Sequence, residues 1–403
     1  MKKIFTFLLG LASGTVAFAQ LTVIHDWAVL TYFYKPLEMV IDTSGNLYTA
    51  NYGSSTVSKI DPNGTVTQSW ATLGNNAIPR DIAIDASGNV YTTNSGNDTV
   101  SKITPTGNLT QAWATLPNGT SPYAIALDTA NNIYTANTNK TISKILANGS
   151  AITQDWAYLA TDAYPKDIIV DNSGNVYTVN QNDTVSKITP SGIVTKAWVT
   201  LANNANPQNI VMDTSGNLYV ANLGNNTVSK ITPTGNVTHA WATLTNNPGP
   251  LCLSIDASGN LYTGNNNSTV SKISPTGVVT QAWATLATGG TYPQGIVKNE
   301  TTGDVYTCNF GVSTISKITA SLATSETIVN NKNITIYPNP VKSILYFSEE
   351  LSEVSLLDIS GRKVLERREK TGKIAIESLP KGNYLLIGKD KNGKEHSEKL
   401  IKE

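Results

Sequence analysis

The sequence predicts an all-β protein, a seven-bladed β-propeller followed by a small C-terminal β-sandwich, and three observations support this prediction. All seven tryptophans recur every 42 or 43 residues between positions 27 and 283. Each repeat contains four short β-rich runs separated by turn residues. After residue 325 the composition changes, because 26 of the last 79 residues are charged against 32 of the preceding 324. A fixed period with four strands per repeat is typical of propeller blades.

The N-terminus precedes the first repeat and has the pattern of a secretory signal peptide over residues 1–19. Met1 and two lysines are followed by an apolar run from Ile4 to Leu11 and by Ala17-Phe18-Ala19. A basic start, a short apolar core and an A-x-A site are typical of such peptides. No other run approaches the roughly 18 apolar residues of a membrane span. We therefore expect an exported protein without a transmembrane segment.

One repeat illustrates the expected strands. Pro79 introduces runs at 81–84, 89–93, 99–104 and 109–115. An Asp-x-Ser-Gly-Asn turn joins the first two runs and a Pro-x-Gly turn joins the last two. Aspartate accepts hydrogen bonds from its own turn and glycine supplies a positive φ, so both connections are tight hairpins. Each repeat is therefore predicted to be a four-stranded antiparallel meander.

The ends of the repeat array predict a closed ring over residues 20–321. The last repeat stops after Ser316-Lys317-Ile318 and has no tryptophan strand of its own. The chain instead begins with an orphan tryptophan strand at residues 23–28. Pairing that strand with the last repeat would complete the seventh blade and remove an open sheet edge.

The repeat consensus is Pro-x-x-Ile-x-[Ile/Val]-Asp-x-Ser-Gly-Asn-[Val/Leu]-Tyr-x-x-Asn. It resembles the NHL-type repeat of gluconolactonase-like and streptogramin-lyase-like propellers over residues 21–320. The resemblance implies the fold, and for the enzymes it implies a divalent metal held by Glu, Asn and Asp, or His and Glu with Mg²⁺. Only Glu38, Asp81 and Asp167 are candidate acids here, and no histidine is expected at the channel. We therefore expect no catalytic residues and no cofactor, with a divalent metal only if the chain is a lactonase- or lyase-like enzyme.

Ligand-binding residues are expected where the repeats differ from one another. The positions after the repeat proline vary and should surround the mouth of the central channel. The charged and aromatic residues chosen there are Glu38, Arg80, Asp81, Tyr123, Lys166 and Asp167. Mixed charge with aromatic surface suits a glycan, peptide or protein ligand. A solvated face without a ligand and a purely structural or adhesive surface protein are the alternatives. Zero net charge gives no reason to expect nucleic acid.

Other repeated or reactive side chains are expected to have structural roles. A Ca²⁺ site needs about six to eight converging oxygens, so one aspartate per repeat favours turn capping. The tryptophans are expected to pack blade against blade. His25 and His239 occupy one repeat position and are expected to be exposed strand residues. Cys252 and Cys308 lie in neighbouring repeats, where export permits a disulfide but spacing does not establish one.

The C-terminal region is predicted to be a linker at 322–333 and a domain at 334–403. Its ordered motifs resemble the type A sorting domain of the type IX secretion system. The motif residues are Tyr337, Pro338, Asn339, Pro340, Asp358, Gly361, Gly382, Tyr384, Lys399, Ile401 and Lys402. The resemblance implies recognition by the translocon, then release or attachment to surface lipopolysaccharide. A small carbohydrate-binding sandwich is the alternative. Asp-Thr-Val at 98–100 and 183–185 resembles the O-glycosylation acceptor of bacteria with this system.

Overall fold

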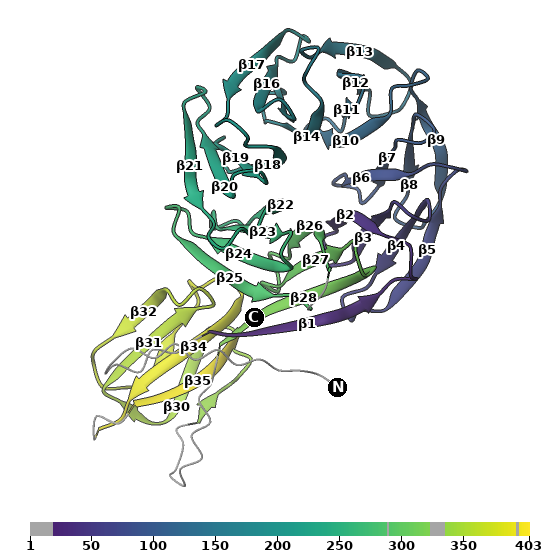
Figure 1. Ribbon diagram of the computed structural model, residues 1–403. Coiled ribbons are helices and arrows are strands. Elements are labelled where there is room, and N and C mark those ends of the chain that lie inside the picture. Colours follow the sequence, from purple (N-terminus) through teal and green to yellow (C-terminus); the bar gives the residue numbers. More distant parts are fainter. Residues whose placement is uncertain (1–18, 288–289, 323–334, 392–394) are drawn as a thin grey trace. The chain divides into compact units, whose positions relative to one another are not determined.

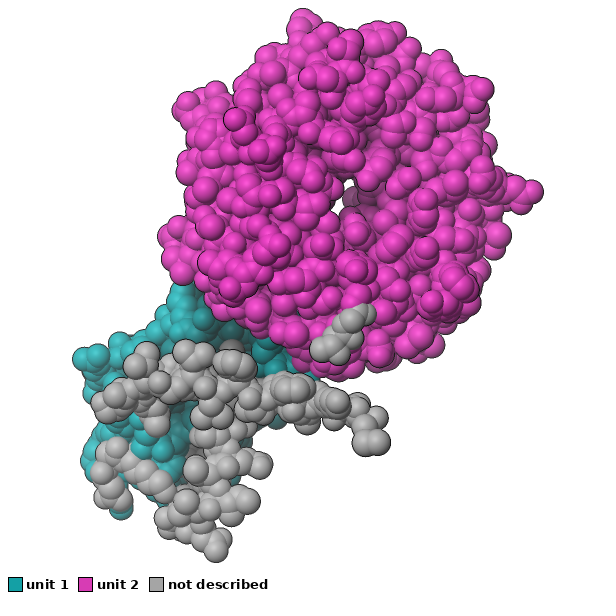
Figure 2. Space-filling model, viewed as in Figure 1, with its two compact units in different colours: residues 1–22, 300–304, 318–403 teal, residues 23–299, 305–317 magenta. Residues whose placement is uncertain are grey.

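The computed structural model describes residues 19–287, 290–322, 335–391 and 395–403, and its regular elements are β-strands. The predicted signal peptide up to residue 18 and most of the predicted linker lie outside these residues. The chain divides into two compact units, coloured in Figure 2 and described here one at a time. Among the described residues, no helix is long and apolar enough to cross a membrane.

Six of the seven blades are antiparallel meanders in chain order, and Figure 1 shows them around a central opening. Each innermost strand begins at the repeat proline, two residues earlier than the expected run at 81–84 in the second blade. The strands of blades 1 to 6 are β2 (Pro36–Ile41), β3 (Leu47–Asn51), β4 (Thr56–Ile60), β5 (Val66–Thr72); β6 (Pro79–Ile84), β7 (Val90–Asn94), β8 (Thr99–Ile103), β9 (Leu109–Thr115); β10 (Pro122–Leu127), β11 (Ile133–Asn137), β12 (Thr141–Ile145), β13 (Ile152–Tyr158); β14 (Pro165–Val170), β15 (Val176–Asn180), β16 (Thr184–Ile188), β17 (Val194–Thr200); β18 (Pro207–Met212), β19 (Leu218–Asn222), β20 (Thr227–Ile231), β21 (Val237–Thr243); β22 (Pro250–Ile255), β23 (Leu261–Asn265), β24 (Thr269–Ile273) and β25 (Val279–Thr285).

The seventh blade confirms the predicted closure. It consists of β26 (Pro293–Lys298), β27 (Val305–Asn309), β28 (Thr314–Leu322) and the N-terminal β1 (Ala19–Val29), in the order β1-β28-β27-β26. Leu30 N donates to Ser313 O at 3.0 Å, which fixes the end of β1 beside β28. Figure 1 shows β1 along the outer edge of β28. Strands from the two ends of the repeat array therefore complete one sheet.

Six of the seven tryptophans contact a turn glycine of the next blade. Trp70 lies 5.0 Å from Tyr48 between ring centroids, and Lys59 Nζ lies 5.5 Å from the Tyr48 ring. Trp70 also faces Gly107 in the following blade, where an added methyl group would lie 3.2 Å from Trp70 Nε1. The other contacts of this kind are Gly64 with Trp27, Gly149 with Trp113, Gly192 with Trp156, Gly235 with Trp198 and Gly277 with Trp241. Blade-to-blade packing of the tryptophans is confirmed.

The repeated aspartates cap turns, as predicted. Asp85 Oδ1 accepts from Ser87 N at 2.9 Å and from Asn89 N at 2.8 Å. Asp85 Oδ2 accepts from Asn89 Nδ2 at 2.8 Å and from Tyr91 Oη at 3.1 Å. Four donors from one turn occupy the carboxylate, which leaves it poorly suited to a Ca²⁺ cage.

The asparagine that ends each second strand organises a buried polar network. Asn94 Nδ2 donates to Thr99 Oγ1 at 2.9 Å and to Ser101 Oγ at 2.8 Å. Thr99 and Thr184, the threonines of the two Asp-Thr-Val sequences, are each only 8% exposed. The expectation that these threonines accept a glycan is therefore wrong for the folded propeller, because their hydroxyl groups are buried in this network.

The C-terminal unit contains the predicted small β-sandwich. One sheet consists of β29 (Ile336–Tyr337), β30 (Ile344–Leu351) and β33 (Thr371–Ala375), and the other of β32 (Lys363–Arg367), β31 (Glu353–Asp358), β34 (Gly382–Lys389) and β35 (Glu395–Lys402). Leu345 and Phe347 of the first sheet share a buried core with Leu356, Leu386 and Leu400 of the second. Apolar side chains from both sheets thus form one interior, as in a sandwich.

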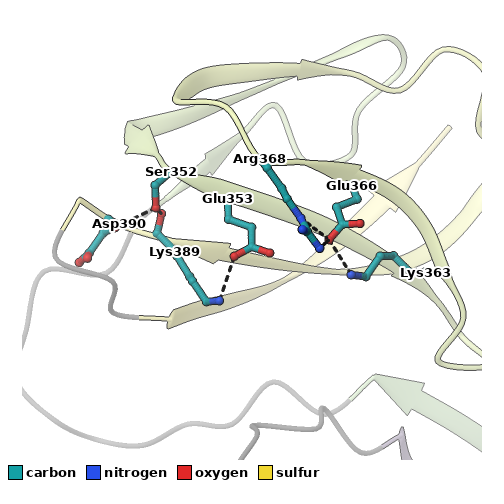
Figure 3. A network of polar contacts seen from close by, with 7 residues as sticks. All are labelled: Ser352, Glu353, Lys363, Glu366, Arg368, Lys389 and Asp390. Atoms are coloured by element: carbon teal, nitrogen blue, oxygen red, sulfur yellow. Dashed lines mark hydrogen bonds and ion pairs between the residues drawn. The ribbon is translucent and has the colours of Figure 1, made fainter.

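The surface of this sandwich is rich in ion pairs, which Figure 3 shows. Lys389 Nζ lies 2.9 Å from Glu353 Oε2, while Glu366 Oε1 accepts from both Lys363 and Arg368. These groups are exposed enough that each pair contributes little to stability. They account for the high charge of this region without forming a site.

Candidate functional site

The third residue of each innermost strand surrounds the central channel, whose opening is visible in Figure 2. These residues are Glu38, Asp81, Ala124, Asp167, Asn209, Cys252 and Gly295. All seven positions are structurally equivalent, yet their side chains differ in charge, size and polarity. The channel is therefore asymmetric, with acids only in blades 1, 2 and 4.

Two of the acids link neighbouring blades. Asp81 Oδ2 accepts from Ile125 N of blade 3 at 2.8 Å, and its Oδ1 accepts from Ile82 N at 2.7 Å. Asp167 Oδ2 accepts from Ile210 N at 2.9 Å and from Asn209 Nδ2 at 2.7 Å, both in blade 5. Both oxygens of each aspartate thus accept hydrogen bonds from backbone amides. These carboxyl groups support the channel wall.

Glu38 has a different environment. Its Oε1 accepts from Met39 N at 3.0 Å. A methyl group added at Gly295 would overlap that oxygen, so the glycine leaves the space that the carboxyl group occupies. Cys308 Sγ, 3.4 Å from Leu37 O, lies beside the same space.

The two cysteines are free, buried thiols, which answers the question that their spacing left open. Cys252 Sγ lies 3.6 Å from Pro293 O in the neighbouring blade. Burial, reinforced by the charge of Glu38, raises the pKa of both thiols well above the ordinary value. A thiol held in the protonated form is a poor nucleophile.

The three acids are difficult to ionise. Burial is the main cause that raises the pKa of Asp81 to about 7 and the pKa of Asp167 to about 8, and the charge of Asp81 adds to the second shift. Burial and then the charge of Asp81 raise the pKa of Glu38 as well. All three residues are half-buried. Near neutral pH the cluster therefore carries less negative charge than three free carboxylates would.

Basic and aromatic side chains alternate around the channel mouth. Arg80 Cζ lies 4.8 Å from the ring centre of Tyr52 and 5.1 Å from that of Tyr123. Lys166 Nζ lies 5.6 Å from the Tyr123 ring. Lys35 Nζ lies 5.4 Å from the Phe310 ring, whose centre is 6.2 Å from that of Tyr52. We call this set, which spans blades 7 and 1 to 4, the channel-mouth arc: Lys35, Tyr52, Arg80, Tyr123, Lys166 and Phe310.

The structure divides the six predicted ligand-binding residues into two sets. Arg80, Tyr123 and Lys166 meet in the arc through their cation–π contacts. Glu38, Asp81 and Asp167 form the channel wall instead, and the two aspartates are held by backbone amides. Successive strand residues such as Arg80 and Asp81 point in different directions. The basic side chain therefore lies in the arc and the acidic one in the channel wall.

Lys35, Tyr52 and Phe310 were missed because they lie in connections before or after the strands. A signal for two of them was present in the sequence. Tyr52 and Phe310 directly follow the repeat asparagine, whereas the same position holds Ser95, Thr138 and Gln181 in blades 2 to 4. Aromatic residues at a variable position of the same face could have indicated them.

The described residues do not fit the divalent metal that related enzymes would require. No three His, Cys, Asp or Glu side chains gather as a metal ligand set in the described part of the chain. His239 in β21 is exposed as expected, and His396 in β35 lies 3.1 Å from Asp390. His25 in β1 was expected to be exposed but is half-buried, with an Nδ1 that has no hydrogen-bond partner among described groups. None of these three strands is an innermost strand.

Two surface hollows are lined by residues other than those of the arc, although Tyr292 of the first accepts a hydrogen bond from Phe310 N at 3.2 Å. One of about 380 Å³ is beside Asn266 and Tyr292 in blades 6 and 7, and one of about 270 Å³ lies beside Ile344 and Thr371 in the sandwich. Neither gathers charged groups around aromatic rings as the arc does. We therefore take the arc as the candidate site.

The sorting motifs meet in space within the sandwich. Asn339 Nδ2 donates to Lys399 O at 2.7 Å, and Ile401 N donates to Asn339 Oδ1 at 2.9 Å. The Tyr-Pro-Asn-Pro segment therefore pairs with the C-terminal strand. Gly361, with φ of 83°, closes the turn that Asp358 caps, and Tyr384 Oη donates to Pro380 O at 2.7 Å. Pro338 and Pro340 flank Asn339, and Lys402 follows Ile401 in β35. Gly382 is the first residue of β34.

Comparison with known families finds two matches. Residues 15–266 match the virginiamycin B lyase family, and residues 335–403 match the secretion system C-terminal sorting domain. The second match confirms the sorting prediction, and the protein is therefore exported by that system to the cell surface. No curated protein matches the sequence.

Solved structures agree on the fold. A catalytically inactive histidine-to-alanine variant of virginiamycin B lyase from Staphylococcus aureus, with quinupristin, is 19% identical over 74% of this chain and 99% of that one, with a TM-score of 0.66. The extracellular domain of a hybrid two-component system from B. thetaiotaomicron is 16% identical over 95% and 59%, with a TM-score of 0.57. PorZ, a type IX secretion surface component of Porphyromonas gingivalis, is 11% identical over 92% and 59%, with a TM-score of 0.54.

Proposed function

The chain belongs to the virginiamycin B lyase family, and we propose that its propeller is a binding module that holds an extracellular glycan, peptide or protein ligand at the channel-mouth arc. The sorting domain delivers the propeller to the cell surface, where such a ligand is available. The signal peptide at residues 1–19 would start this route.

One observation carries this proposal, namely the position of Arg80 between Tyr52 and Tyr123. Arg80 Nε also donates to Ser95 Oγ at 3.3 Å, so two rings and a hydroxyl group hold the guanidinium. A charged group that is already oriented loses little conformational freedom when a ligand binds. Arginine and tyrosine are also the residues that most often dominate binding energies.

The positions of the histidines favour binding over lyase chemistry. The inactive variant of the S. aureus lyase lacks one histidine. Here His25, His239 and His396 lie in β1, β21 and β35, none of which is an innermost strand of a blade. The acids that remain in the channel support its wall. No histidine is therefore available as a general base in the described part of the arc.

Array binding tests this proposal. The full chain should bind a subset of immobilised glycans or peptides, and Arg80→Ala or Tyr123→Ala should remove those signals, because each deletes one side of the cation–π contact. Lys102→Ala is the matched control, since Lys102 makes the same contacts with Tyr91 and Trp113 in outer strands of the same blade. Signals that survive in Arg80→Ala and Tyr123→Ala, or a chain that binds nothing, would overturn the proposal.

A further inference from the structure

We propose that the ligand of the channel-mouth arc is an acidic glycan, whose carboxylate groups are bound by Arg80 and Lys166 on either side of Tyr123. This inference rests on the proposed binding function and names the chemical class of its ligand. It is carried by the unpaired positive charge of the arc, by the orientation of Arg80 and by the alternation of cations with rings.

The positive charge of the arc is not neutralised within the described structure. Lys35, Arg80 and Lys166 form no salt bridge there, whereas described basic residues of the sandwich, such as Lys389, do. Burial and then the charge of Arg80 lower the pKa of Lys166, so the two cations repel each other. An anion between them would relieve that repulsion, and complementarity of this kind gives specificity.

The nearby acids do not act as the missing partners. Asp81 and Asp167 turn their oxygens toward backbone amides of their own and adjacent blades. Their raised pKa values further reduce the negative charge that faces the arc. The cations are therefore left available to a charge that comes from outside.

The orientation of Arg80 suits a carboxylate. Its Cζ lies over the rings of both Tyr52 and Tyr123, and Nε donates to Ser95, so the remaining guanidinium N–H groups are the ones that can receive a ligand. Two parallel N–H groups match the two oxygens of a carboxylate. Lysine cannot supply that fork, which makes Arg80 the group that distinguishes a carboxylate from a simple point charge.

The sequence of groups along the arc favours a polymer with a repeated acidic unit. Cations occur in blades 1, 2 and 4, with Tyr52, Tyr123 and Phe310 between them. Tyr32 and Phe33, in the connection that leads to Lys35, are 68% and 65% exposed and extend the aromatic surface. A chain of uronic acids offers an apolar sugar face and a carboxylate in every unit, which matches this alternation.

The test compares the full chain's affinity for an oligogalacturonate, for the same oligosaccharide with its carboxyl groups reduced to alcohols, and for an oligoglutamate peptide. Calorimetry should detect the oligogalacturonate, with an affinity that falls as salt rises because exposed charges are screened beyond about 8 Å at 0.15 M salt. Arg80→Gln and Lys166→Gln should each weaken it about tenfold or more, as expected for hydrogen bonds to a charged group. Arg80→Lys should not restore binding, because the fork is lost.

Matched controls lie in the same blades. Lys102→Gln and Lys187→Gln remove one cation from a Tyr–Trp stack in outer strands and should leave the affinity unchanged. If the reduced oligosaccharide bound as tightly as the oligogalacturonate, the proposal of an anionic ligand would be overturned. The proposed binding function would not be contradicted by that result. If the chain bound oligoglutamate but not oligogalacturonate, the proposal that the ligand is a glycan would be overturned. If instead the array experiment gave no signals that depend on Arg80 and Tyr123, the proposed binding function itself would be contradicted.

Discussion

Two carboxyl groups, one in β2 and one directly after it, show how local donors decide the chemistry of an acid. Asp42 and Glu38 both belong to the start of blade 1, four positions apart. Burial would raise the pKa of Asp42, but hydrogen bonds from Asn46 and Tyr48 outweigh it and hold the pKa below its usual value. Glu38 has one backbone donor against burial and a neighbouring charge, so its pKa rises. The turn acid Asp42 thus ionises readily, whereas the channel acid Glu38 resists ionisation.

The channel acids predict a stability that falls with rising pH. The pKa of Asp167 is about 8 in the folded chain, above the unfolded value of about 3.9, so the native state holds the extra proton. The contribution of Asp167 to the free energy of unfolding is therefore highest below about pH 4. It decreases between about pH 4 and pH 8, by at most about 1.4 kcal/mol per pH unit for each proton. Asp167→Asn should flatten this slope between about pH 5 and pH 8, measured by urea unfolding.

The control for that slope is Asp213→Asn. Hydrogen bonds from Asn217 and Tyr219 outweigh burial and lower the pKa of Asp213. The contribution of Asp213 to stability is present above its pKa in the unfolded chain. It is lost only as the pH falls through its pKa in the folded chain. This variant should change stability in acid and leave the slope between about pH 5 and pH 8 intact. Identical slopes for wild type and Asp167→Asn would contradict the assignment.

At the level of elements, the turn between the third and fourth strands is the point where one blade receives the next. Its glycine has a positive φ, and the tryptophan of the preceding blade covers it. Gly149 is the tightest case, since an added methyl would lie 2.8 Å from the Trp113 ring. The glycine therefore has two roles, because it permits the backbone conformation and leaves room for an aromatic ring.

Gly149→Ala and Gly119→Ala separate these two roles. Gly149 has φ of 72° and Gly119 has φ of 82°, so alanine is strained by about 1–2 kcal/mol at both positions. Nothing lies within 4 Å of a methyl group at Gly119, whereas Trp113 blocks one at Gly149. Gly149→Ala should lose a further 1–3 kcal/mol or so from overpacking, measured by denaturant midpoints. Equal losses would mean that the tryptophan contact does not constrain the turn.

For the whole molecule, what the sequence predicts well is what repeats. The period and the turn aspartates were sufficient to predict the ring because they recur in the repeats. The orphan strand was sufficient to predict its closure because only the last repeat lacks a tryptophan strand. The arc was only half predicted. Arg80, Tyr123 and Lys166 follow the repeat proline, but Tyr52 and Phe310 reach them from other connections, and hydrogen bonds hold Asp81 and Asp167 to adjacent blades. Contacts between blades are long-range, so strand patterns do not specify them.

Ring closure by β1 gives a prediction at this scale. Removing residues 1–30 takes Trp27 from its stack on Tyr306, a loss of about 3–5 kcal/mol for the tryptophan alone, and exposes the edge of β28. The truncated chain should melt at lower temperature and self-associate through that edge, as seen by light scattering, whereas removal of residues 1–18 should do neither. A synthetic peptide of residues 19–30 should restore the monomer and the melting temperature, because it replaces the missing strand. The same peptide with Trp27→Ala should restore them less well. A monomeric truncated chain with unchanged melting would show that the other blades hold the ring without β1.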